Sequence, residues 1–152
     1  RRTRHEFVPR VHKEHPRLLA EMFAYCIAAA HLSLPHKLVR SLMVSNYGCN
    51  PSEGWPFVDQ LPTNDTCIVA SNPNHDENPL PNVIHYCQDY RVGECFFSKY
   101  QVKGDFFSCK SPLLQSPPSN LASVNYIMNN NGKKEEFEEK HAKREAFMIC
   151  GI

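Results

Sequence analysis

The most constraining feature of the sequence is the stretch from residue 47 to 81, which is rich in Gly, Pro, Asn, Asp and Ser. Proline fixes φ and removes a backbone donor, and the other residues favour turns, so long helices and strands cannot form there. We expect a long ordered loop that Trp55 and its neighbours anchor, with a disulfide between Cys49 and Cys67 as a further candidate tie. A loop of this length in a compact domain is usually functional or held by disulfides.

The chain has 152 residues, of which 41% are hydrophobic, and a formal net charge of +1. This length supports one domain with a real core and leaves little room for a second. Charges of both signs are spread along the chain, so it has neither a basic field for nucleic acid nor an acidic tail for a cationic partner. Charge therefore argues against a nucleic-acid partner and names no ligand.

The longest apolar stretch, residues 24–34, is interrupted by His31 and is shorter than the roughly 20 residues of a bilayer-spanning helix. We therefore expect any membrane anchor to lie outside this chain. The sequence begins Arg-Arg-Thr-Arg, and we expect it to be a piece of a longer protein. We divide it into a basic lead-in at residues 1–12, a globular part at 13–121, and a linker with a charged helical tail at 122–152.

Seven cysteines occur without any Cys-x2-Cys spacing, so a zinc knuckle is not indicated. Disulfides formed in an oxidising compartment explain this number better, and the sequon Asn64-Asp65-Thr66 fits that compartment as a glycosylation site at Asn64. An odd number leaves at least one thiol unpaired within the chain, and Cys26, in an apolar segment, is our candidate. The cysteines that we predict to form disulfides are Cys49, Cys67, Cys87, Cys95 and Cys109.

The spacing of apolar residues predicts a helix over residues 16–32, with proline in its first turn. Runs of β-branched and aromatic residues predict short strands or extended segments at 82–87, 95–100 and 105–109. Residues 129–132, Asn-Asn-Asn-Gly, are typical of a flexible joint. Residues 133–150 are dense in Glu and Lys at i,i+4 spacing, which favours a solvated surface helix.

Few residues stand out as candidates for chemistry. Glu21, within the apolar helix, either faces water or meets a partner, because isolated burial of a carboxylate is costly. His85, in a strand-like run, is either a core histidine bonded to the backbone or a rigid ligand for a divalent metal. His12 and His15 have the spacing of a metal site but lack a further ligand. The chain also lacks a Gly-rich phosphate cradle, a Gly-x-Ser-x-Gly elbow and an Asp-x-Asp pair.

Four segments of the sequence are informative when taken together: HKEHPRLLAEMFAYCIAAAHLSLPH, GCNPSEGWPFVDQLP, LPNVIHYCQDYRVGECFFSKYQVKGDFFSCKSPLL and PPSNL. In this order they resemble the closing part of the peptidyl serine α-galactosyltransferases and hydroxyproline O-arabinosyltransferases, and are closest to the serine galactosyltransferase branch. The likeness runs from about residue 12 to 121. It implies an α/β fold, the carboxyl-terminal, acceptor-side part of a glycosyltransferase-A type fold, with long disulfide-tied loops and a charged C-terminal helix.

The resemblance also implies roles for particular residues. Glu21 matches a carboxylate that lines the acceptor site, and His85 matches a late histidine that completes the shell of a divalent metal, Mn²⁺ or Mg²⁺. The metal would neutralise the departing diphosphate. Arg91 and Lys99 are candidates for binding the same phosphates or are surface cations, and Trp55 is either a platform for sugar or peptide or a loop anchor.

One position departs from the family pattern. Relatives have tryptophan where this chain has Cys95, which removes a large ring and offers a thiol. Local packing, or a bridge from Cys95 to Cys109, is expected to differ here.

Two hypotheses follow from the sequence. In the first, a longer enzyme in the lumen of the endoplasmic reticulum or Golgi transfers galactose or arabinose from a UDP-sugar to serine or hydroxyproline hydroxyls of secreted proteins. This fragment alone would be inactive. In the second, the chain is a noncatalytic secreted or complex-bound module with the same scaffold. An upstream half that carries an Asp-x-Asp pair distinguishes the first from the second.

Overall fold

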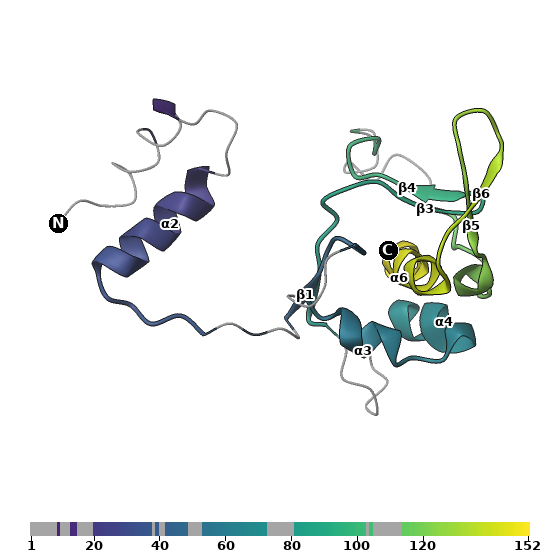
Figure 1. Ribbon diagram of the computed structural model, residues 1–152, viewed down its shortest axis with the longest axis horizontal. Coiled ribbons are helices and arrows are strands. Elements are labelled where there is room, and N and C mark those ends of the chain that lie inside the picture. Colours follow the sequence, from purple (N-terminus) through teal and green to yellow (C-terminus); the bar gives the residue numbers. More distant parts are fainter. Residues whose placement is uncertain are drawn as a thin grey trace. The chain divides into compact units, whose positions relative to one another are not determined.

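The structure, a computed structural model, describes residues 9, 13–14, 20–37, 39, 42–48, 53–72, 81–102, 104 and 114–152. The chain divides into two compact units, residues 1–38 and 39–152 (Figure 1). Residues 122–152 pack with the rest of the second unit. The division predicted from the sequence, with boundaries after residues 12 and 121, stays a prediction.

Helix α2, Ala20–His31, confirms the helix predicted near the start of the chain. A tight turn ends it, in which Ser33 has a φ of 54° and the Leu34 N–H donates to Ala29 O at 2.9 Å. Such a turn satisfies carbonyls that the last turn of a helix leaves without partners. Pro35 follows, a residue that cannot continue a helix because it lacks the backbone donor.

The strands described in the second unit form three pairs, which confirms a mixed α/β fold. The strands β1 and β2 are parallel, whereas β3–β4 and β5–β6 are antiparallel. An isolated bridge between Gly93 and Ile127 links the two antiparallel pairs. The strand bounds are β1 Met43–Val44, β2 Val83–Ile84, β3 Tyr90–Val92, β4 Cys95–Phe97, β5 Tyr126–Met128 and β6 Lys134–Glu136.

The strands predicted at residues 82–87 and 95–100 are therefore confirmed but shorter, as β2 and β4. The segment predicted at 105–109 lies outside the described residues, as do His12, His15, Cys49 and Cys109.

Short helices interrupt the segment that we predicted as a long loop, and that part of the prediction was wrong. They are α3 Trp55–Asp59, the 3-10 turn η1 Thr63–Asp65, and α4 Thr66–Ser71. Pro56 lies in the first turn of α3, where its missing N–H costs no helical hydrogen bond. The Gly- and Pro-rich composition thus limits the length of helices without preventing them.

The predicted joint at residues 129–132 is instead the turn of the β5–β6 hairpin. Asn129 Oδ1 accepts the backbone N–H groups of Asn131 at 3.0 Å and Lys133 at 2.9 Å. Gly132 has a φ of 70°, which a residue without a Cβ adopts at little cost. The side-chain hydrogen bonds of Asn129 therefore close the turn.

Helix α6, Glu139–Cys150, is the centre of the second unit, so the expectation of a solvated surface helix was wrong. Figure 1 shows α6, in yellow, with α3 and α4 on one side and the antiparallel strand pairs on the other. Every residue from Ala142 to Cys150 is buried. The 3-10 turn η2, Leu121–Ser123, also packs against it.

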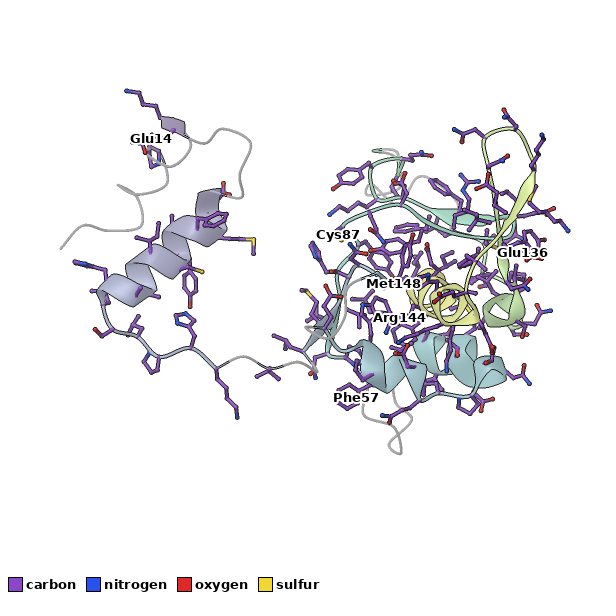
Figure 2. All side chains as sticks on the ribbon, in the orientation of Figure 1. Glu14, Phe57, Cys87, Glu136, Arg144 and Met148 are labelled. Carbon is purple, nitrogen blue, oxygen red and sulfur yellow. A yellow bond between two sulfur atoms is a disulfide. The ribbon has the colours of Figure 1, made fainter. Side chains whose placement is uncertain are left out.

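Two buried cations of α6 bind the end of α3. Arg144, 2% exposed, donates from Nε and Nη2 to both carboxylate oxygens of Asp59 at 2.8 and 2.7 Å, and from Nη1 to Tyr47 O at 2.7 Å. Lys143 Nζ donates to the backbone oxygens of Asp59, at 2.7 Å, and Leu61. Figure 2 shows Arg144 and Met148 inside the second unit. These bonds satisfy the carbonyl of the last residue of α3 and compensate the charges that α6 brings into the core.

We predict that Arg144→Met lowers the free energy of unfolding by about 3–5 kcal/mol, because it leaves the Asp59 carboxylate without its bidentate partner. Lys140→Met is the matched control: Lys140 is 45% exposed and lies 3.3 Å from the same carboxylate. An exposed pair of this kind contributes about 1 kcal/mol or less. Urea unfolding measures the free energy of unfolding of both variants. Equal decreases in Arg144→Met and Lys140→Met would contradict the prediction that the Arg144–Asp59 pair contributes more.

A disulfide joins Cys67 at the start of α4 to Cys150 at the end of α6. The predicted Cys49–Cys67 pairing was therefore wrong, because packing of α4 on α6 brings Cys150 to Cys67. Cys87 and Cys95 are free thiols, which contradicts their predicted disulfides, including Cys95–Cys109. Cys26 is free as predicted, and its side chain is exposed.

We predict that Cys150→Ser lowers the free energy of unfolding by about 4–5 kcal/mol, because the disulfide joins residues separated by 83 positions and so restricts the unfolded chain. Cys95→Ser, which removes a free thiol, should cost no more than about 1 kcal/mol. Denaturant unfolding of the oxidised proteins tests both values. A loss in Cys150→Ser no larger than that in Cys95→Ser would contradict the prediction.

Candidate functional site

The candidate site lies at the carboxyl ends of β1 and β2. Because this pair is parallel, Ser45 after β1 and His85 after β2 lie at the same edge. In α/β proteins this is the edge at which ligands bind. The His85 N–H donates to Val44 O at 2.9 Å, so its backbone is fixed, whereas its side chain is exposed. His85 is therefore not a core histidine.

One buried hydroxyl ties the two strand ends together. Tyr90 is fully buried, and its hydroxyl donates to Ser45 O at 2.7 Å and lies 3.3 Å from His85 O. The same oxygen accepts the Cys87 N–H at 3.3 Å. Burial raises the pKa of Tyr90 well above its usual value, so the hydroxyl keeps its proton. This role of Tyr90 could not be predicted from the sequence, because the carbonyls that it contacts come near it only in the folded chain.

Glu53 is a second residue whose role could not be predicted from the sequence. Its carboxylate accepts the Ser45 N–H at 2.6 Å and the Ser45 hydroxyl at 2.5 Å. Trp55 Nε1 donates to the carbonyl of the next residue, Asn46, at 2.8 Å. The loop before α3 is thus bonded to the end of β1. Glu53 lies in a Gly- and Pro-rich segment, and no pattern in the sequence indicates its contact with Ser45.

Trp55 is 0% exposed, and the Arg144 guanidinium lies 5.2 Å from its ring. The ring therefore has no open face for a sugar or peptide. Its packing in the core favours the anchor alternative over the substrate-platform alternative.

The two candidate phosphate-binding cations differ in their surroundings. Arg91, on β3, is half-buried, with its guanidinium 4.4 Å from the Phe96 ring. Lys99, after β4, is exposed, with Nζ 5.1 Å from the Tyr100 ring. Both positive charges are therefore held near the β3–β4 hairpin by aromatic neighbours.

Glu21 lies in the first turn of α2, in the first unit, and its side chain is exposed. A carboxylate there is favoured by the positive end of the helix dipole. Much of the helix surface around it is apolar and exposed, through Met22, Phe23, Tyr25 and Ile27.

A complete metal shell does not form from the described residues alone. No group of three His, Cys, Asp or Glu side chains gathers anywhere in the part of the chain that the structure describes. Zinc, manganese and magnesium sites usually need three or more such ligands or several bound oxygens. His85 can therefore contribute one metal ligand at this edge. A metal ion bound there would need further ligands from outside the described residues.

A cleft of about 1100 Å³ lies between α4, β4, the carboxyl end of α6 and residues 114–119. Its lining includes Cys95 and the two cysteines of the disulfide, Cys67 and Cys150. Burial, and then the charge of Glu94, raise the pKa of that thiol. Cys95 is therefore protonated at neutral pH and is a weak nucleophile.

No protein-family model, curated protein or solved structure matches this chain at a significant level. The resemblance to glycosyltransferases is therefore an expectation from the sequence strings of residues 12–121 alone. Among the helices that the structure describes, none is long and apolar enough to cross a bilayer.

A buried carboxylate of α6 supports the strand that carries Tyr90. Glu145 is buried, and its Oε2 accepts the Arg91 N–H at 3.0 Å. Burial raises the pKa of Glu145 to about 7, although the hydrogen bond from Arg91 opposes this. Burial, and then the charge of Glu145, also raise the pKa of Tyr47. This carboxyl therefore changes charge near neutral pH.

We predict that the protein loses stability as the pH rises from about 4.5 to about 7, because the folded state holds a proton on Glu145 that the unfolded state has released. The loss should be on the order of 3 kcal/mol. Glu145→Gln still accepts the Arg91 N–H but does not titrate, so its stability should depend less on pH in this range. Denaturant unfolding at several pH values measures both slopes, and identical slopes would contradict the prediction.

Proposed function

We propose that this chain is the acceptor-side part of a glycosyltransferase of the secretory pathway. The enzyme transfers galactose or arabinose from a UDP-sugar to serine or hydroxyproline hydroxyls of secreted proteins. The sequence strings from residue 12 to 121 suggest the family. The observation that carries the proposal is the exposed side chain of His85, on a fixed backbone, at the carboxyl edge of a parallel strand pair.

Each candidate residue has a separate role in the proposal. His85 supplies one imidazole ligand to a Mn²⁺ or Mg²⁺ ion, whose remaining ligands include an Asp-x-Asp pair that this sequence lacks. When bound, such a metal neutralises charge on the leaving diphosphate. Arg91 and Lys99 add positive charge for the same phosphates, and Glu21 contacts the acceptor hydroxyl.

The disulfide supports the proposed compartment. Cys67–Cys150 joins two helices across the core, and disulfides persist in oxidising environments such as the lumen of the secretory pathway. The same environment suits an alternative function, a noncatalytic secreted module with this scaffold. Assay of the native full-length protein with UDP-galactose or UDP-arabinose and a serine- and hydroxyproline-rich peptide distinguishes the two, because the module would transfer neither sugar.

We predict that His85→Ala in the native full-length protein raises the Mn²⁺ concentration needed for half-maximal transfer at least about tenfold, because one ligand is lost. The free energy of unfolding should change by about 0.5 kcal/mol or less, since the side chain is exposed. His31→Ala, which alters an exposed histidine at the end of α2, is the control and should leave both quantities unchanged. Unaltered metal dependence in His85→Ala would remove His85 from the site.

A further inference from the structure

The sequon Asn64-Asp65-Thr66 lies where the turn η1 is followed by α4, and the side chains of its asparagine and threonine differ in exposure. Asn64, in η1, is exposed, as are Asp65 directly after it and Pro62 two positions before it. Thr66, the first residue of α4, is 0% exposed. A glycan on Asn64 would therefore extend into solvent, although the threonine of the same sequon is inside the core.

Folding also occupies the threonine hydroxyl. Thr66 Oγ1 donates to Pro62 O at 3.1 Å, and the Asp65 N–H donates to the same carbonyl at 3.0 Å. The transferring enzyme must reach both the asparagine amide and the threonine hydroxyl of its acceptor. In the folded chain the hydroxyl is buried and bonded, and the tripeptide is wound into a turn instead of being extended.

The disulfide keeps this turn closed. Cys67 directly follows Thr66 and is bonded to Cys150, which is buried at the end of α6. Opening residues 62–67 far enough to expose Thr66 would require α4 to separate from α6, the core helix to which it is covalently attached. The open state is therefore rare once the disulfide has formed.

We propose that Asn64 carries an N-linked glycan that is added before residues 62–67 fold, and that pairing of Cys67 with Cys150 ends the period in which it can be added. This inference rests on the proposed secretory localisation and is independent of sugar transfer by the chain itself. In the reaction, the Asn64 amide nitrogen bonds to the anomeric carbon of a lipid-linked diphosphate oligosaccharide. The bond from that carbon to the diphosphate breaks, the amide loses a proton, and the lipid diphosphate leaves.

The order of events agrees with the positions in the chain. Asn64 leaves the ribosome well before Cys150, which lies 83 positions after Cys67. The sequon is therefore available as an extended segment until the carboxyl-terminal helix has been made. The sequence contains no second Asn-x-Ser/Thr sequon, since Asn50-Pro51-Ser52 has proline in the middle position.

The test compares folded and unfolded forms of the same sequon. The oxidised chain is purified from a bacterial host that lacks N-glycosylation, and its disulfide is verified by thiol titration. It is then incubated with microsomal membranes and a lipid-linked oligosaccharide donor, in parallel with a synthetic peptide of residues 60–70. Mass spectrometry measures glycan on Asn64. We expect the peptide to be modified and the folded chain to be modified at least about tenfold less, in proportion to its open population.

Two controls make the result specific. Asn64→Gln should accept no glycan, and oxidised Cys95→Ser, which keeps the Cys67–Cys150 disulfide, should resist modification as the wild type does. A standard acceptor peptide in the same tube shows that the transferase is active. Equal modification of the folded chain and the peptide would overturn the proposed order. Failure of the 60–70 peptide beside a modified standard would overturn the site itself.

Discussion

The second unit depends on the ion pair between Arg144 and Asp59. Helix α6 is central to the packing of this unit, yet it carries charged residues that water would ordinarily keep at the surface. The bidentate contact of Arg144 with Asp59, together with the bonds from Lys143 to carbonyls at the end of α3, makes burial of this helix tolerable. α4 and β3 then pack against the same helix.

The sequence predicted local features better than the environment of each element. Apolar spacing identified α2, and the aromatic run identified β4. The existence of a carboxyl-terminal helix followed from its composition, but its burial did not, because Glu- and Lys-rich segments are usually solvated. The carboxylate that compensates the buried charge of Arg144 belongs to Asp59, which lies 85 positions away in the sequence. Such pairings depend on the tertiary structure and leave no local pattern.

In the candidate site, too, the local structure could be predicted from the sequence but the tertiary contacts could not. His85 could be placed at the end of a short strand from its β-branched neighbours, and the structure places it directly after β2 with its side chain exposed. The contacts of Tyr90 and Glu53 with Ser45 could not be predicted, since residues 45 and 90 are distant in the sequence and the bonds to the Ser45 backbone leave no local sequence pattern. The sequence left two roles open for Trp55, and the burial of its ring, which favours the anchor role, depends on the tertiary structure.

The Cys67–Cys150 disulfide closes a covalent ring that contains β2, β3, β4 and the hairpin β5–β6. A protease that cuts a single peptide bond within this ring leaves both products attached to each other through sulfur. His85 and the strand that supports it would thus remain joined to α4 after such a cut. In a compartment rich in proteases, a nicked molecule of this kind would separate into fragments only under reducing conditions.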